Sequence, residues 1–303
     1  MAPLSINTTI KLRSGYEIPQ LGIRVCQTPP KDTERCVNEA FRAGYRHIDL
    51  AVSYRNEAGC GQAIRSSSSP TRDQIFFTSR IRPRAVSYEG TKAQIEKTLA
   101  ESGLEYIDLM LLHAPYGGSA RCKGAWKALV EAVEDGKVRS IGVSNYSVHY
   151  LDELERHIAE LEEERGGKGK GGIISVGQWE IHPFCPQRDI VEWCFTRGIA
   201  VEAYSPLVCG MRWGEPMLKK LAEKYAKSEA QILIRWSLQK GFIPLPKSVT
   251  PERIWSNADV YNFELTSEEV DELETDEYSP VCWDLNKASL EEWACNEREV
   301  HTQ

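Results

Sequence analysis

The sequence predicts an α/β protein built as one (β/α)8 TIM barrel, with an N-terminal β-hairpin and a C-terminal tail over the barrel mouth. Three observations predict this fold. Short apolar runs alternate eight times with longer amphipathic stretches, which is the pattern of a parallel barrel. The length of 303 residues suits such barrels, which commonly use roughly 250–300 residues as one domain. The first apolar run lacks the Gly-x-Gly-x-x-Gly sequence of a nucleotide-binding open sheet.

We expect a single domain over residues 1–303, with the hairpin at 5–19, the barrel at 20–262 and a C-terminal helix and tail at 266–303. The hairpin turns at Ser14–Gly15. The barrel strands are short and apolar, and the run IDLMLLH is the most apolar of them. We expect the eight strands at Gln20–Cys26, Arg46–Ala51, Ile75–Ile81, Ile107–His113, Ser140–Ser144, Ile173–Ile181, Ala200–Ser205 and Phe242–Lys247.

The stretch after each strand has the apolar spacing of an amphipathic helix. Gly44 ends the first of these helices, and Thr-Pro-Glu begins the last. We expect the helices at Lys31–Gly44, Asn56–Ser66, Tyr88–Ser102, Lys123–Glu134, Val148–Glu164, Gln187–Arg197, Met217–Lys240 and Pro251–Ala258.

Two segments lie outside the eight units. Arg165–Gly172 is rich in glycine and lysine and is interpreted as a solvated loop. The tail from Thr266 begins with TSEEVDELE, a capping box followed by a helix. Trp283 and Trp293 then either line a pocket mouth or pack on the barrel wall.

The composition is that of an ordinary globular protein, with a net charge of −7. This balance disfavours binding to nucleic acid or to anionic membranes, and no run approaches the ~18 apolar residues of a membrane span. Met1–Thr9 has no signal-peptide pattern. The nine cysteines include no CxxC pair, so we expect no metal site, and the cysteine usage fits a reducing cytoplasm.

Polar residues gather at successive strand ends, where reactive groups of this fold lie. Asp49 and Tyr54 follow the second strand, Arg80 ends the third and His113 ends the fourth. A nearby cation lowers the pKa of a phenol, which makes it a usable general acid. Each residue also has a structural interpretation, as a cap, a salt-bridge partner or a core histidine, but four together favour a proton-handling site.

The segments HIDLAVSYRNE, LLHAP, IGVSNY, EAYSPL and PLPKSVTPERIWSN, in this order, resemble the aldo-keto reductase family from about residue 8 to about residue 275, in a style similar to its fungal members. The resemblance implies an NADPH-dependent barrel that reduces aldehydes and ketones and is monomeric or weakly oligomeric. By position, the family's catalytic tetrad falls on Asp49, Tyr54, Arg80 and His113. The substrate would be a small carbonyl compound.

The resemblance also assigns an NADP(H) site. Ser144, Asn145 and Gln178 match residues that hold the nicotinamide carboxamide, and Tyr204 matches the ring stacked on the nicotinamide. Ser205 and Leu207 match contacts to the pyrophosphate. The residues that match the adenosine and 2′-phosphate site are Lys247, Ser248, Val249, Thr250, Arg253 and Asn257. The residues themselves agree, because a helix start with two cations suits a phosphate monoester.

Three departures from the family pattern fall at the catalytic centre. Arg80 replaces a lysine, and its planar head group cannot join a proton relay. Arg24 replaces a glycine and puts a large cation near the nicotinamide ribose or the substrate, so we include it among the cofactor-site residues. Cys26 stands where an aromatic residue often walls the substrate pocket, and we expect a wider, less apolar pocket there.

Three functions remain open at this point. The first is reduction of an aldehyde or ketone, with Tyr54 as the general acid. The second is non-redox chemistry on the same fold, such as dehydration, isomerisation or cyclisation. The third is a non-catalytic barrel that binds NADP(H). The segment Pro115–Cys122 is expected to be a short loop that leaves the pocket open to a substrate larger than glyceraldehyde.

Overall fold

The computed structural model describes residues 3–26, 28–52 and 56–285. Within them, eight parallel strands form one sheet in which each strand pairs with the next along the chain. The sheet closes where the Arg24 N–H donates to the Pro246 carbonyl and Arg24 bridges to Lys247. The predicted barrel is therefore confirmed. Its strands are β3 (Gly22–Arg24), β4 (His47–Asp49), β5 (Phe76–Ile81), β6 (Ile107–Leu112), β7 (Val138–Ser144), β8 (Ile174–Glu180), β9 (Ala200–Tyr204) and β10 (Ile243–Leu245).

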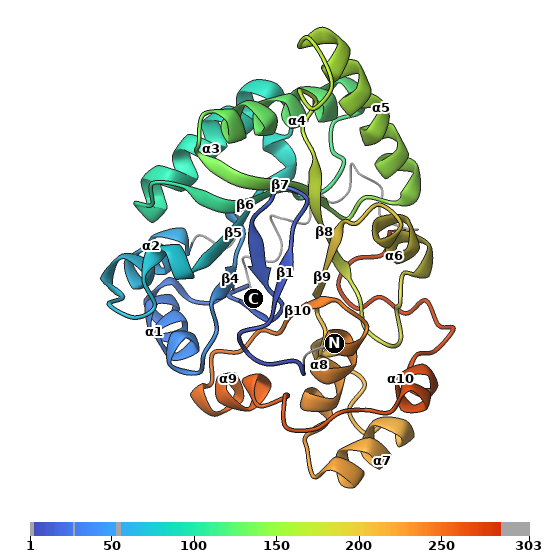
Figure 1. The fold of residues 1–303 in the computed structure, drawn as a ribbon. Helices are drawn as coiled ribbons and strands as arrows, with labels where there is room; N and C mark the ends of the chain where they lie inside the picture. The colour runs from blue at the N-terminus through green and yellow to red at the C-terminus, as the bar shows by residue number, and fades with distance from the viewer. Residues whose placement is uncertain (1–2, 27, 53–55, 286–303) are drawn as a thin grey trace.

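The helices surround the strands, and the hairpin lies across one end of the barrel (Figure 1). The hairpin consists of β1 (Thr9–Lys11) and β2 (Glu17–Pro19), paired antiparallel as predicted. The described helices are α1 (Pro30–Arg42), α2 (Glu57–Ser66), α3 (Tyr88–Ser102), α4 (Ser119–Glu134), α5 (Val148–Glu164), α6 (Arg188–Phe195), α7 (Pro216–Tyr225), α8 (Glu229–Gln239), α9 (Pro251–Ala258) and α10 (Ser267–Leu273). None of them has the length and apolar character needed to cross a membrane.

Several predicted helix boundaries match the structure because local signals set them. Gly44 follows α1 with a φ of 98°, a conformation that glycine adopts without strain. Thr266 begins α10 with a capping box, in which the Thr266 hydroxyl accepts from the Glu269 N–H and the Glu269 carboxylate accepts from the Thr266 N–H.

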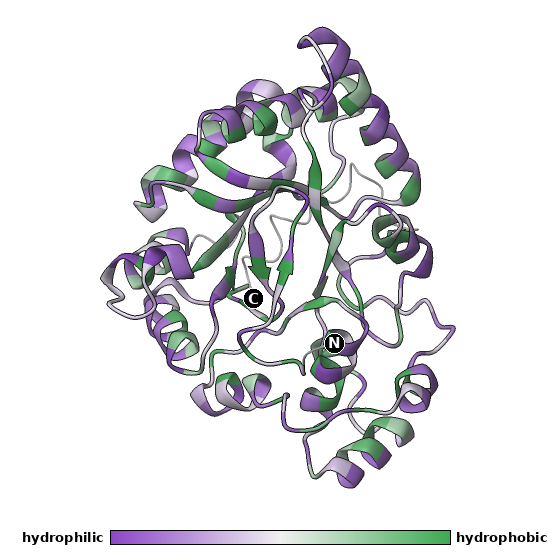
Figure 2. Ribbon diagram, in the orientation of Figure 1, coloured by the Kyte–Doolittle hydropathy of each residue, from purple (hydrophilic) through white to green (hydrophobic). Residues whose placement is uncertain are grey.

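Two predicted elements were wrong. Residues 217–240 form two helices, because Ala226 has a left-handed backbone and Ser228 starts α8 with its own capping box. The helix predicted from Lys123 begins at Ser119, so the expected loop Pro115–Cys122 is only partly a loop. Ser119 has a hydrogen bond to His157 of α5, which helps to hold this first turn. Around these helices, polar faces point outward and apolar faces point to the strands (Figure 2).

The barrel interior has an apolar part and a polar part. Strand alternation turns every second side chain inward. Near the hairpin these side chains are apolar, and they form a cluster with Leu12 and Ile18 of the hairpin segment. The other side chains of the interior are polar or charged, and buried: His47 at the start of β4, and Asp49, Thr78, Arg80, Gln178 and Glu202 further along their strands. The interior thus becomes polar at the face where barrels of this class carry their active sites.

Candidate functional site

Asp49 and Arg80 form a fully buried ion pair at the ends of β4 and β5. Arg80 Nη2 lies 2.6 Å from Oδ1 and 2.5 Å from Oδ2 of Asp49. Arg80 Nη1 donates to the Leu50 carbonyl at 2.7 Å, and its Nε donates to Gln178 Oε1 at 3.0 Å. These bonds fix the guanidinium inside the barrel, so Arg80 is not an ordinary rim charge.

Gln178, on β8, joins this pair to a second carboxylate. Its Nε2 donates to Asp49 Oδ2 at 3.1 Å and to Glu202 Oε2 at 2.5 Å. Its Oε1 accepts from both Nε and Nη2 of Arg80. An amide has two N–H donors and two acceptor lone pairs, so this side chain is saturated. To bind a carboxamide, Gln178 would first have to release one of these partners.

Glu202 belongs to the site although the sequence reasoning did not select it. Burial, and then the charge of Asp49, raise the pKa of Glu202 to about 8. His47 lies beside it, with Nε2 3.4 Å from Glu202 Oε1, and burial lowers the pKa of His47 to about 4. The sequence does contain a signal for Glu202, because a carboxylate within the apolar run AVEAY must be buried in the barrel.

His113, Asn145 and Tyr204 lie together at the carboxyl ends of β6, β7 and β9. The Tyr204 hydroxyl donates to Asn145 Oδ1 at 2.9 Å, and Asn145 Nδ2 donates to the His113 carbonyl at 3.0 Å. Burial, with the charges of Arg80 and Arg24, lowers the pKa of the His113 imidazole well below its usual value. His113 is therefore a neutral hydrogen-bonding group at neutral pH.

Arg24, at the end of β3, covers the ring of Tyr204. Its guanidinium carbon lies 4.8 Å from the ring centroid, which is within the range of a cation–π contact. Its Nε is also 3.7 Å from Asp49 Oδ1, and its side chain is 12% exposed. Arg24 thus contacts the ring that is expected to stack on the nicotinamide.

The loop after β9 has a strained backbone. Ser205, Val208 and Cys209 all have φ near +50°, as does Asn145 after β7 at 57°. Such conformations are unfavourable for residues other than glycine and cluster at functional sites. Ser205 and Leu207, the predicted pyrophosphate contacts, lie on this loop. Tyr54 lies outside the described residues.

The predicted phosphate-binding residues lie at the start of α9. Lys247 and Arg253 are exposed, and the Thr250 side chain does not cap the helix. Ser248 Oγ accepts from the Thr250 N–H at 3.2 Å, and Arg35 of α1 donates to the Val249 carbonyl. Asn257 lies further along α9 and is buried. Ser144, a predicted nicotinamide contact at the end of β7, donates to the Gln178 carbonyl.

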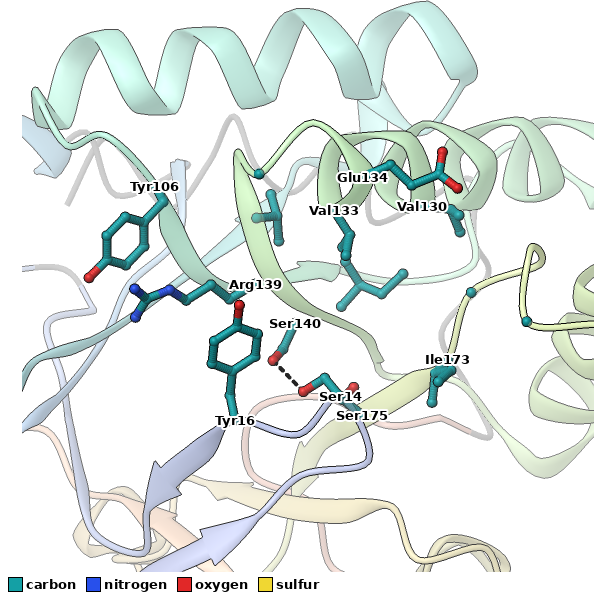
Figure 3. Close-up of a pocket in the computed structure, with 15 residues that line it drawn as sticks. Ser14, Tyr16, Tyr106, Val130, Val133, Glu134, Arg139, Ser140, Ile173 and Ser175 are labelled. Atoms are coloured by element: carbon teal, nitrogen blue, oxygen red, sulfur yellow. Dashed lines mark hydrogen bonds between the residues drawn. The ribbon is translucent and has the colours of Figure 1, made fainter. Parts of the chain in front are cut away.

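A cavity of about 500 Å³ lies at the opposite end of the barrel (Figure 3). It is lined by residues that precede or begin strands, including Tyr106, Arg139 and Ser175, and by Ser14 and Tyr16 of the hairpin turn. This end contributes to stability in barrels of this class, so we do not assign the cavity to the catalytic site. Among the described residues, no three His, Cys, Asp or Glu side chains gather as a metal site requires.

The chain resembles known proteins over most of its length. The sequence profile of the aldo/keto reductase family matches residues 19–276. The chain is 41% identical to an uncharacterised oxidoreductase of Schizosaccharomyces pombe, over 88% of this chain and 93% of that protein. It is 38% identical to the glyoxal reductase of Bacillus subtilis, over 90% of this chain and 94% of that protein.

Two solved structures have the same fold. An aldo/keto reductase from Brucella melitensis superposes with a TM-score of 0.81 and 38% identity, covering 89% of this chain and 98% of that one. A mutant of Gox0644 in complex with NADPH superposes with a TM-score of 0.82 and 32% identity, covering 93% of this chain and 99% of that one.

Proposed function

The chain belongs to the aldo-keto reductase family, and from this premise we propose that it reduces an aldehyde or ketone to an alcohol with NADPH. The observation that carries the proposal is the buried Asp49–Arg80 pair, whose charge acts on the neighbouring His113 imidazole. It places a permanent cation, a neutral imidazole and hydrogen-bonding amides at the carboxyl ends of the strands. Such groups stabilise the negative charge that develops on a carbonyl oxygen and assist its protonation.

The donor set at α9 fits the adenosine end of NADP(H). The 2′-phosphate of NADP(H) is a dianion that favours a helix N-terminus and flanking cations. Thr250 leaves the first N–H groups of α9 uncapped by its side chain, and Lys247 and Arg253 supply the charge. We assign Lys247, Ser248, Val249, Thr250, Arg253 and Asn257 to this end.

The nicotinamide end fits after one rearrangement. Among the described residues, Asn145 uses one of its two amide N–H groups and one of its two acceptor lone pairs. It therefore retains a donor and an acceptor for a carboxamide, with Ser144 beside it. Tyr204 can stack on a nicotinamide only when Arg24 moves off its ring. Ser205 and Leu207 would contact the pyrophosphate, and Gln178 acts as a positioning residue for Arg80.

The residues divide the chemistry as follows. NADPH, when bound, supplies the hydride. Tyr54 donates its phenolic proton to the carbonyl oxygen. The positive charge of the Arg80 guanidinium favours loss of that proton, while Asp49 holds the guanidinium in place. His113, being neutral, donates a hydrogen bond to the same oxygen and does not compete as an acid.

A direct assay tests this function. The near-ultraviolet absorbance of NADPH should fall when the protein is incubated with a panel of aldehydes and ketones that includes glyoxal, the substrate named for the Bacillus subtilis relative. A protein that binds NADPH but oxidises none of it with any of these carbonyls would favour non-redox chemistry or a binding role.

Arg253→Ala should weaken the binding of NADPH, and not that of NADH, by ~1.5–3 kcal/mol, because one charge-assisted hydrogen bond to the 2′-phosphate is lost. NADH, which lacks that phosphate, should bind the variant and the parent protein equally. Fluorescence titration with both nucleotides measures this. Arg156→Ala, at an exposed arginine on α5, is the matched control. Equal affinity of the parent protein for NADH and NADPH would contradict the assignment.

Arg24→Gly should strengthen NADPH binding and raise turnover of uncharged aldehydes, because it clears the ring of Tyr204. Hydride transfer is sensitive to small misplacements, so removing the competing cation favours the reactive geometry. Arg80→Lys alone should gain less, since Arg80 is held inside the barrel by hydrogen bonds to Leu50 and Gln178. Steady-state NADPH oxidation by both single variants and the double variant measures this. If Arg24→Gly instead loses turnover of a polar or anionic carbonyl substrate, Arg24 binds a polar group of that substrate and does not hinder the reaction.

A further inference from the structure

Two cysteines that are distant in sequence meet at the edge of the candidate site. Cys209 lies on the loop after β9, and Cys282 lies in the tail beyond α10. Their sulfur atoms are 3.5 Å apart, and both residues are exposed. A disulfide requires a separation of ~2.05 Å, so about 1.5 Å remains to be closed. The other described cysteines are buried or half-buried, and none of them has such a contact with a second cysteine.

The tail is held in the position that brings Cys282 to this loop. The Glu180 carboxylate, at the end of β8, accepts hydrogen bonds from the N–H groups of Val281, Cys282 and Trp283 at 2.5, 2.8 and 3.0 Å. Burial acts to raise the pKa of Glu180, but the bonds from His182 and these N–H groups outweigh it and lower the pKa. The contact is therefore anchored by a charged side chain of the barrel.

We propose that Cys209 and Cys282 form a peroxide-sensitive dithiol whose disulfide fastens the tail to the loop after β9 and slows exchange of the dinucleotide. The link to the dinucleotide rests on the proposed function, because Ser205 and Leu207 of this loop are proposed pyrophosphate contacts. Ser205 Oγ already lies 3.0 Å from Cys282 Sγ. In the reduced protein the tail can leave this hydroxyl, whereas the disulfide would hold Cys282 against it.

Cys209 is the cysteine that reacts first. The hydrogen bond from the Cys282 thiol, assisted by Ser205, lowers the pKa of Cys209 to about 6 against the effect of burial. The same pairing, together with burial, raises the pKa of Cys282. Cys209 is thus mainly a thiolate at neutral pH, which is the nucleophilic form.

The chemistry balances with hydrogen peroxide as the oxidant. The Cys209 thiolate attacks one peroxide oxygen, the O–O bond breaks, and the departing hydroxide takes a proton to become water. The Cys282 sulfur then attacks the sulfur of the resulting sulfenic acid. The S–O bond breaks, and the second hydroxide leaves with the Cys282 proton as water. Two thiols and one peroxide give one disulfide and two waters.

The experiment treats the whole protein with hydrogen peroxide and applies two readouts. Peptide mapping without reductant should find a linked pair that contains Cys209 and Cys282, reversed by dithiothreitol. Stopped-flow fluorescence should find NADPH association slowed several-fold in the oxidised protein. Cys209→Ser and Cys282→Ser should each abolish both effects, whereas Cys194→Ser, at a buried cysteine of α6, should abolish neither.

The two readouts separate the proposals. Absence of the linked peptide, or an oxidation response that survives in both serine variants, overturns the dithiol. A linked peptide with unchanged NADPH kinetics overturns its role in dinucleotide exchange. If the reduced protein binds no NADPH at all, the proposed function fails, while peptide mapping still decides whether the disulfide forms.

Discussion

Tyr54→Phe is expected to lower turnover by roughly 10²–10⁴-fold, the usual contribution of a positioned general acid. The substitution keeps the aromatic ring and removes only the proton that the carbonyl oxygen must receive. NADPH affinity should therefore stay the same. Steady-state oxidation of NADPH and fluorescence titration measure the two quantities.

Tyr16→Phe provides the matched control for this experiment. Tyr16 is 44% exposed and lies beside the hairpin turn (Figure 3), at the end of the barrel opposite the carboxyl ends of the strands. The control should turn over substrate at the parental rate. If Tyr54→Phe also keeps near-parental turnover, the proton comes from another group and the assignment of Tyr54 is wrong.

Arg80→Met should reduce the free energy of unfolding by ~3–5 kcal/mol, the usual cost of leaving a buried charge without its partner. Asp49 and Arg80 are both fully buried, and Glu202 lies in the same interior layer. Without the guanidinium, the buried Asp49 carboxylate loses its hydrogen-bonded ion-pair partner and, among the described residues, keeps only the hydrogen bond from Gln178.

Urea unfolding followed by circular dichroism measures this loss. Arg80→Lys keeps the charge and should lose less stability than Arg80→Met. Arg197→Met breaks an exposed pair with Glu155 and should cost no more than about 1 kcal/mol. A loss for Arg80→Met as small as that of the surface control would show that the buried pair does not stabilise the barrel.

Local patterns predicted most of the fold because each element carries its own signals. The boundaries of α3, α5 and α9 follow from apolar spacing, a capping serine before Tyr88 and a proline at position 251. The break between α7 and α8 was missed, although Ser228 and Gln231 are spaced as a capping box. The helical spacing of apolar residues continues across that break, so it predicted one long helix despite the capping box.

The sequence predicted individual residues of the candidate site, but not the hydrogen bonds and contacts that join their side chains. The sequence placed Asp49, Arg80 and His113 at neighbouring strand ends, and the structure brings them together. The saturation of Gln178 by its neighbours depends on side chains from three strands, so no local pattern contains it. The contact between Cys209 and Cys282 spans 73 residues and likewise exists only in the folded chain.

Deuterium labelling decides whether a hydride passes from NADPH to a carbonyl carbon in this barrel. NADPH that carries deuterium at the transferred position is incubated with the protein and a carbonyl substrate, and the alcohol product is analysed by mass spectrometry. We expect one deuterium on the former carbonyl carbon, with product formation strongly reduced in Tyr54→Phe. An alcohol without deuterium, or a product formed with no oxidation of NADPH, would contradict it.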